Sequence, residues 1–251
     1  MKKGLLVYML GLVFSAHASA KMITYKIGDK EFEGYLAGSG EKGSILVVHN
    51  WLGLTKETMS KADQLSALGY TVFAADVYGK GIRPKNVDEA KAETAPYYSN
   101  RSLLRERVAG ALSELRKLSK GPKDKYAAIG YCFGGTSVVE LGRSGADLKA
   151  IISFHGGLDS PKPEDGKYIK AKVLALHGAD DPFVTAENLT KFEAEMREHK
   201  IDWQLIKYGG AVHSFTDKNA GTDASKGAAY NADADTRSWA AMRTFLESTF
   251  K

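Results

Sequence analysis

A series of short apolar runs, separated by longer polar or amphipathic stretches, constrains the fold of this chain more than any other feature. The runs read SILVV at 44–48, YTVFAA at 70–75, YAAI at 126–129, KAIISF at 149–154, KVLAL at 172–176 and WQLIKY at 203–208. Short runs of this kind are typical of parallel strands buried on both faces of a sheet. The pattern therefore predicts a mostly parallel central sheet.

Helical patterns fill the stretches between these runs. Leucine and valine recur on one face of 104–118, and 185–199 and 235–250 are also amphipathic. Alternating strands and helices predict an α/β fold, with right-handed crossovers that place helices on both faces of the sheet. Residues 22–36 differ, because two alternating runs flank Gly28 and Asp29 and predict an N-terminal antiparallel β-hairpin.

Residues 1–20 have the three parts of a secretory signal peptide. Lys2 and Lys3 form a charged start, residues 4–16 are apolar but too few to span a bilayer, and Ala18-Ser19-Ala20 matches a cleavage site. We therefore expect cleavage before Lys21, a single domain at 21–251, and a periplasmic or secreted protein. An uncleaved membrane anchor and a buried N-terminal helix are the alternatives.

Composition limits the partners and the stabilising groups. The formal net charge of +5 falls to +3 once Lys2 and Lys3 leave with the signal, and no basic cluster predicts nucleic-acid binding. No apolar run after residue 20 is long enough to span a membrane, so we expect no stable membrane insertion after cleavage. Cys132 is the only cysteine, which excludes an internal disulfide. The sequence predicts no cofactor and makes no prediction of oligomeric state.

That cysteine stands in the turn Gly130-Tyr131-Cys132-Phe133-Gly134-Gly135, between a predicted strand and a predicted helix at 136–143. The glycines let the chain turn sharply and let the helix approach closely. Cys132 would then lie at a helix N-terminus, where the dipole favours a thiolate. The turn predicts a cysteine nucleophile, although a small buried thiol or a phosphate-binding turn also fits the motif taken alone.

A thiol nucleophile needs a base, and the base needs a group that orients it. Asp181 follows one predicted strand, and His213 follows the next. The order nucleophile, acid, histidine, with each member after a strand, is that of the α/β-hydrolase fold. Asp180 is adjacent to Asp181, but the spacing to Pro182 and Val184 favours Asp181 as the acid.

With these residues in place, the chain resembles the dienelactone hydrolases, which carry a Cys-Asp-His triad in a G-x-C-x-G-G elbow. The resemblance runs from about Ser44 to the C-terminus and includes HNWLGL at 49–54, ADVYG at 75–79, DPFV at 181–184 and HSF at 213–215. It implies an α/β-hydrolase fold and a carboxylic ester or lactone hydrolase. His49, His155 and His177 each follow a predicted strand, but their separations match no zinc spacing, and we predict no metal.

The resemblance implies a role for each matching residue. Cys132 would attack an ester or lactone carbonyl and form a thioester, while His213 would act as general base and then acid, oriented by Asp181. The backbone N–H groups of Phe133 and Trp51 would stabilise the oxyanion. Alternatives with the same residues are an acyl transferase or thioesterase, a ligand-binding protein without turnover, and a thiol redox sensor.

Two departures from the family pattern concern the thiol and the substrate. The family usually has a glutamate beside the loop donor, where this chain has Asn50, and two arginines that hold the carboxylate of dienelactone, where it has Lys80 and Asp217. Lys80 is a weaker substitute, and Asp217 has the opposite charge. We therefore expect a small neutral or differently charged ester or lactone, contacted by Asn50, Tyr131 and Lys80. The aromatic side chains beside the elbow, Trp51, Tyr131 and Phe133, fit either a substrate-binding wall or core packing, and their proximity to the elbow favours the wall.

Overall fold

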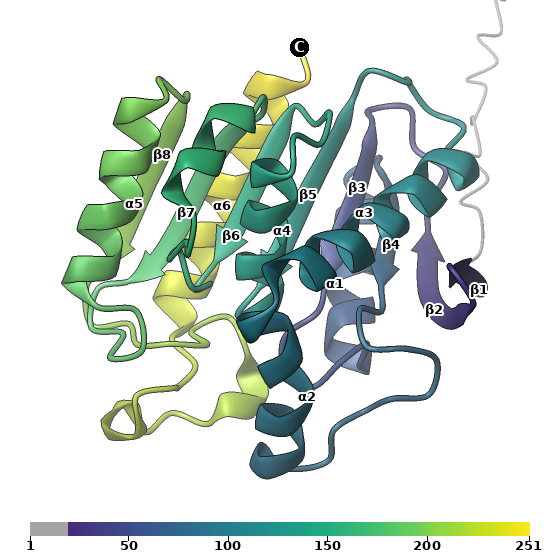
Figure 1. Ribbon diagram of the computed structural model, residues 1–251. Helices are drawn as coiled ribbons and strands as arrows, with labels where there is room; N and C mark the ends of the chain where they lie inside the picture. Colours follow the sequence, from purple (N-terminus) through teal and green to yellow (C-terminus); the bar gives the residue numbers. More distant parts are fainter. Residues whose placement is uncertain (1–19) are drawn as a thin grey trace, which may run out of the picture.

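The computed structural model describes residues 20–251, which form one α/β unit (Figure 1). In chain order its elements are β1 (Lys21–Ile27), β2 (Lys30–Ala37), β3 (Ser44–Val48), α1 (Lys56–Ala67), β4 (Thr71–Ala75), α2 (Val87–Ser99), α3 (Arg101–Leu118), β5 (Tyr126–Tyr131), α4 (Phe133–Arg143), β6 (Ala150–Phe154), β7 (Lys172–Gly178), α5 (Ala186–Glu198), β8 (Trp203–Tyr208) and α6 (Ala232–Thr249). Three short 3₁₀ helices are η1 (Pro163–Tyr168), η2 (Lys218–Ala220) and η3 (Ala224–Lys226). The expected signal peptide falls on residues 1–20, and 1–19 lie outside the described part.

The eight strands form a single sheet in the order β1-β2-β4-β3-β5-β6-β7-β8. The strands from β3 to β8 pair in parallel, while β1 and β2 pair antiparallel and β2 joins β4 antiparallel. The hairpin turns at Gly28, whose φ of 58° suits glycine. The predicted mostly parallel sheet and the N-terminal hairpin are confirmed.

Helices cover both faces of the sheet because its central strands are apolar on both sides. Leu46 and Val48 belong to the core shared with α3, α4 and α5, whereas Ile45 and Val47 belong to the core shared with α1 and α6. Figure 1 shows α3, α4 and α5 in front of the sheet and α6 behind it. Every residue of β3, β4, β5 and β6 is buried.

Two helices and one strand differ from the sequence expectations. The prediction that all six runs are buried on both faces is wrong for β8, because it is an edge strand and five of its six side chains are only partly buried or exposed. No periodic pattern in the sequence predicted α1 or α2. In α2 the apolar residues are scattered, and Pro96 lies inside the helix. None of the helices within residues 20–251 is long and apolar enough to cross a bilayer.

Candidate active site

Cys132 lies at a strained turn between β5 and α4. Its backbone has φ 55° and ψ −117°, a conformation that non-glycine residues rarely adopt. Its N–H donates to the Phe154 carbonyl at 3.0 Å, which ties the turn to β6. A Cβ at Gly130 would overlap the backbone of Gly134, so the turn closes only with glycine there. The cysteine is thereby held at the N-terminus of α4, with its thiol facing a cavity.

The structure brings Cys132, His213 and Asp181 together in a hydrogen-bonded chain. Nε2 of His213 lies 3.1 Å from Sγ of Cys132, and Nδ1 lies 2.8 Å from Oδ2 of Asp181. The other Asp181 oxygen, Oδ1, accepts from the backbone N–H groups of Phe183 and Val184 at 2.8 and 3.2 Å. Both carboxylate oxygens are therefore engaged, and the carboxylate fixes the plane of the imidazole.

Each member of this chain follows a parallel strand at the carboxyl edge of the sheet. Cys132 follows β5, Asp181 follows β7, and His213 follows β8. The adjacent Asp180 points elsewhere, because its carboxylate accepts from the Gly210 N–H at 2.9 Å. Asp181 is thus the carboxylate in contact with His213, as its spacing to Pro182 predicted.

The surroundings of His213 favour the imidazolium. Burial lowers the pKa of His213, but the negative charge of Cys132 and the hydrogen bonds to Asp181 and Cys132 outweigh burial and raise the pKa to about 10. The cation is therefore stabilised between a sulfur and a carboxylate.

The two backbone N–H groups expected to bind an oxyanion belong to Phe133 and Trp51. Phe133 is the first residue of α4, and Trp51 lies in the loop after β3. Within residues 20–251 neither N–H donates a hydrogen bond to a protein acceptor. In contrast, the Trp51 carbonyl accepts from the Tyr78 hydroxyl at 2.9 Å. The loop that carries Trp51 is therefore anchored while its N–H stays available.

A cavity of about 620 Å³ opens onto Cys132 and His213. Its walls are mainly apolar and aromatic, and the contributing side chains are Trp51, Val87, Tyr98, Phe183, Val184 and Ala228. Charged residues also line it, namely Lys91, Asp159 and Lys226. Asp159 is paired with Arg101 at 2.8 Å, so its charge is already balanced. A cavity of this size and lining suits a small, largely apolar molecule.

The three residues expected to contact substrate do not line this cavity. The Asn50 side chain bonds its own loop and α1, accepting from the Leu52 N–H at 2.9 Å and donating to Glu57 at 3.0 Å. Tyr131 is buried in the core, and its ring stacks on that of Phe154 with the centroids 4.7 Å apart. Lys80 is exposed and pairs with Glu31 at 3.5 Å beside the hairpin.

The expected aromatic wall is only partly formed. Trp51 lines the cavity, but the Phe133 side chain is fully buried and packs on the rings of Tyr78 and Tyr97. Instead, α2 supplies Val87, Lys91 and Tyr98, which sequence reasoning missed because this helix carries no clear periodic signal. Phe183, in the motif that contains Asp181, could have been found from its position beside the triad acid.

The remaining histidines at the ends of strands do not form a metal site. His49 accepts from the Val77 N–H, and His155 lies against the Thr216 hydroxyl at 2.9 Å. Burial lowers the pKa of His155 and of His177, so both rings are neutral. Over residues 20–251 no three His, Cys, Asp or Glu side chains gather as metal ligands would.

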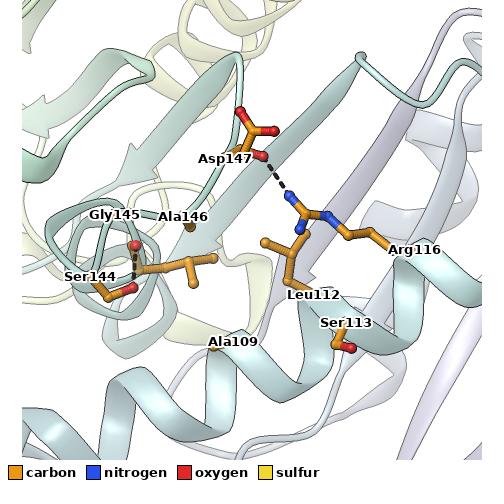
Figure 2. A pocket seen from close by; sticks show the side chains of 9 residues that line it. Ala109, Leu112, Ser113, Arg116, Ser144, Gly145, Ala146 and Asp147 are labelled. Carbon is orange, nitrogen blue, oxygen red and sulfur yellow. Dashed lines mark hydrogen bonds between the residues drawn. The ribbon is translucent and has the colours of Figure 1, made fainter.

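A second hollow, of about 360 Å³, lies at the opposite edge of the sheet, between α3 and the loop after α4 (Figure 2). Arg116 crosses it and donates to the Asp147 carbonyl at 2.7 Å. Asp147 precedes β6, whereas Cys132 follows the parallel strand β5, so the two hollows are far apart. Of these two hollows, only the Cys132 cavity combines a reactive group with a binding volume.

Known proteins share this arrangement. The profile of the dienelactone hydrolase family matches residues 32–250. A solved structure named m3DLH superposes with a TM-score of 0.88 and 36% identity, covering 93% of this chain and 99% of its own. A dienelactone hydrolase-like promiscuous phosphotriesterase from metagenomic libraries superposes with a TM-score of 0.87 and the same identity and coverage.

A curated relative is also an enzyme of this kind. A probable 2-oxo-3-(5-oxofuran-2-ylidene)propanoate lactonase of a Bradyrhizobium species is 23% identical over 187 residues, which cover 70% of this chain and 75% of the relative. The family match extends over nearly all of the described chain. The chain belongs to the dienelactone hydrolase family and is an ester or lactone hydrolase.

Proposed function

We propose that this protein hydrolyses small, largely apolar carboxylic esters or lactones, with Cys132 as nucleophile, His213 as general base and acid, and Asp181 as the group that orients His213. The observation that carries the proposal is the continuous chain from Sγ through the imidazole to the carboxylate, at 3.1 and 2.8 Å, opening onto an apolar cavity. Family membership supports the reaction class.

The first half of the reaction forms a thioester. The Cys132 thiolate attacks the carbonyl carbon, and the carbonyl electrons move to oxygen, where the N–H groups of Phe133 and Trp51 bind the negative charge. The tetrahedral intermediate collapses, the C–O bond to the leaving group breaks, and His213 gives its proton to the departing alkoxide. An acyl group remains on sulfur.

Water completes the second half. Neutral His213 takes a proton from water as the oxygen attacks the thioester carbonyl, and the same two N–H groups bind the second oxyanion. The C–S bond then breaks, which releases the carboxylic acid and restores the thiolate beside the imidazolium. For a lactone both product groups stay in one molecule, so the product is a hydroxy acid.

The proposal extends to location. Residues 1–20 combine a charged start, an apolar segment and Ala18-Ser19-Ala20, which supports cleavage before Lys21 and a periplasmic or secreted mature protein. The first strand begins at Lys21, directly after the expected cleavage site. N-terminal sequencing of protein recovered from a periplasmic fraction would test this, and an intact Met1 would contradict it.

Activity is tested with p-nitrophenyl butyrate and with a panel of lactones. Cys132→Ala and His213→Ala should each abolish turnover, while Asp180→Ala, the matched control for Asp181→Ala, should retain it. Mass spectrometry of His213→Ala or of wild type quenched in acid should show one acyl group attached to Cys132. Equal turnover by wild type and Cys132→Ala would refute the cysteine mechanism.

A further inference from the structure

We propose that His49 is a positioning residue, whose imidazole fixes the Asn50–Trp51 peptide so that the Trp51 N–H faces the reacting carbonyl. This inference rests on the proposed function, since it concerns how the second oxyanion donor is held. His49 follows β3, is completely buried, and does not line the cavity. It therefore acts through the peptide next to it rather than on the substrate.

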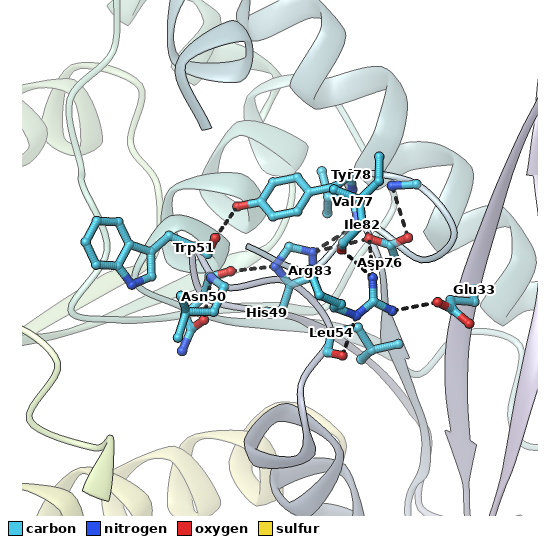
Figure 3. A network of polar contacts seen from close by, with 12 residues as sticks. Glu33, His49, Asn50, Trp51, Leu54, Asp76, Val77, Tyr78, Ile82 and Arg83 are labelled. Atoms are coloured by element: carbon cyan, nitrogen blue, oxygen red, sulfur yellow. Dashed lines mark hydrogen bonds and ion pairs between the residues drawn. The ribbon is translucent and has the colours of Figure 1, made fainter. Parts of the chain in front are cut away.

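The hydrogen bonds of His49 select one form of its ring (Figure 3). The backbone N–H of Val77 donates to Nε2 at 3.0 Å, which requires a lone pair on Nε2. The ring is consequently the neutral tautomer with its proton on Nδ1. Nδ1 lies 2.6 Å from the Asn50 carbonyl oxygen, so this N–H donates to that carbonyl.

The orientation of that carbonyl determines the direction of the next N–H. All peptide bonds within the described residues are trans, and in a trans peptide the C=O and the following N–H point in opposite directions. Because the Asn50 carbonyl points at the His49 ring, the Trp51 N–H must point away from that ring. A flipped peptide would turn a carbonyl oxygen toward the developing oxyanion and would leave the buried Nδ1–H without a partner.

Neighbouring contacts hold the ring and the rest of the loop. The His49 ring packs edge-on against Tyr78, with centroids 4.7 Å apart, and stacks against Phe133 at 6.1 Å. Tyr78 also donates its hydroxyl to the Trp51 carbonyl, as Figure 3 shows. The peptides on both sides of the Trp51 Cα are thus clamped by two side chains that pack on each other. Any buried histidine needs hydrogen-bond partners for both ring nitrogens. For His49 one of these partners is the carbonyl of the Asn50–Trp51 peptide, whose N–H is the proposed oxyanion donor.

Two substitutions test the hydrogen bonds of the two ring nitrogens separately. In His49→Asn the amide occupies the place of Nδ1, so it can still donate to the Asn50 carbonyl but no longer accepts from Val77. In His49→Gln the amide reaches the place of Nε2, so the Val77 bond is kept and the donor to Asn50 is lost. We expect His49→Gln to lower kcat for p-nitrophenyl butyrate about 100-fold with little change in KM, the loss typical of one oxyanion donor. We expect His49→Asn to stay within about tenfold of wild type.

The rate at which iodoacetamide alkylates Cys132 distinguishes the loss of an oxyanion donor from general damage to the site. Alkylation consumes the thiolate but forms no oxyanion, so both variants should alkylate at the wild-type rate. Equal losses of kcat in the two variants, an unchanged kcat in His49→Gln, or alkylation that falls in parallel with kcat would each overturn the assignment. Turnover that survives Cys132→Ala would instead refute the proposed function, which is a separate measurement.

Tyr78→Phe keeps the test decisive if His49→Gln does not fold, as judged by circular dichroism. It removes only the hydroxyl that holds the Trp51 carbonyl, and the ring packing against His49 remains. The expected result is again a lower kcat with an unchanged rate of alkylation. A kcat equal to that of wild type would show that the loop needs no clamp, and the inference would fail.

Discussion

The side-chain amide of Asn50 donates to Oε2 of Glu57 at 3.0 Å, which ties the loop after β3 to the first turn of α1. The same amide group accepts from the Leu52 N–H through its oxygen, so every polar atom of this side chain serves the loop. Glu57 is partly buried and close to the acidic side chains of Asp217 and Asp235. Burial raises the pKa of Glu57 to about 7, and Asp217 adds to the effect. A carboxyl group that titrates near neutral pH thus supports the loop that carries Trp51.

Replacing Glu57 with glutamine should remove a dependence of stability on pH. A raised carboxyl pKa gives stability that is fully present below the ordinary value of 4.5 and is lost as the pH rises through about 7. The free energy of unfolding of the wild type should therefore fall by about 3 kcal/mol relative to Glu57→Gln between pH 4.5 and pH 8. Urea denaturation at both pH values measures this difference.

Glu198→Gln is the matched control, because Glu198 is exposed at the end of α5. It should leave the pH dependence of unfolding as in the wild type. If the Glu57→Gln protein lost stability with rising pH as steeply as the wild type, Glu57 would not be the titrating group.

Removing the thiol should lower the pKa of His213. The Cys132 charge is the largest influence that raises this pKa against burial, and a Cys132 hydrogen bond adds to it. In Cys132→Ala burial is opposed by Asp181 alone, so the imidazole should lose its proton well below the value of about 10 found with the thiol present. NMR titration of the His213 ring protons measures both values, and an unchanged midpoint would show that the sulfur carries no charge.

Arg143 should be essential for folding, because it neutralises two buried carboxylates. Its guanidinium contacts Glu195 at 2.6 and 2.8 Å and Glu140 at 2.9 Å, and it also donates to the Leu158 and Asp159 carbonyls. Arg143→Met should lower the free energy of unfolding by about 3–5 kcal/mol, since it leaves buried charge unpaired.

The control for Arg143 is Lys191→Ala, which removes an exposed ion pair with Glu187. Its unfolding midpoint in urea should match that of the wild type. A small effect of Arg143→Met would mean that Arg105, which also contacts Glu140 at 2.8 Å, suffices to neutralise the cluster.

Gly134→Ala should destabilise the protein although alanine favours helices. A Cβ at Gly134 would overlap the Val48 and His49 carbonyls, so α4 would have to move away from β3. We expect a loss of about 1–3 kcal/mol and lower activity, because α4 carries the Phe133 N–H. Gly209→Ala, where a Cβ meets nothing within 4 Å, is the control. Equal melting temperatures for the two variants would contradict the close approach of α4 and β3.

The sheet was predictable because its central strands are continuous apolar runs that need burial on two faces. The runs at 44–48 and 203–208 coincide with β3 and β8, and the hairpin turns where Gly28 allows it. The contact among Cys132, Asp181 and His213 also follows from sequence order, because parallel strands end at the same edge. In contrast, α2 has no such pattern, and its role in the cavity depends on tertiary packing.

Side-chain directions at the site were predicted less well than positions along the chain. Tyr131 lies two residues after Ile129 on the same strand, so alternation places both on the α1 and α6 face, away from the cavity. Lys80 follows β4 and meets Glu31 of the hairpin, a pairing that depends on the antiparallel addition of β2. The hydrogen bond between Asn50 and Glu57 likewise joins a loop to the helix after it. Such contacts depend on backbone paths that local sequence does not specify.

Cys132, Asp181 and His213 follow three different strands, β5, β7 and β8, so the contact among them can form only late in folding. Since β6 separates β5 from β7, and β8 is the edge strand, Cys132 meets His213 only after four neighbouring strands have docked in register. Before that point the sulfur has neither its imidazole nor its turn, and it behaves as an ordinary thiol. The appearance of esterase activity during refolding should therefore report the docking of β8 at the edge of the sheet.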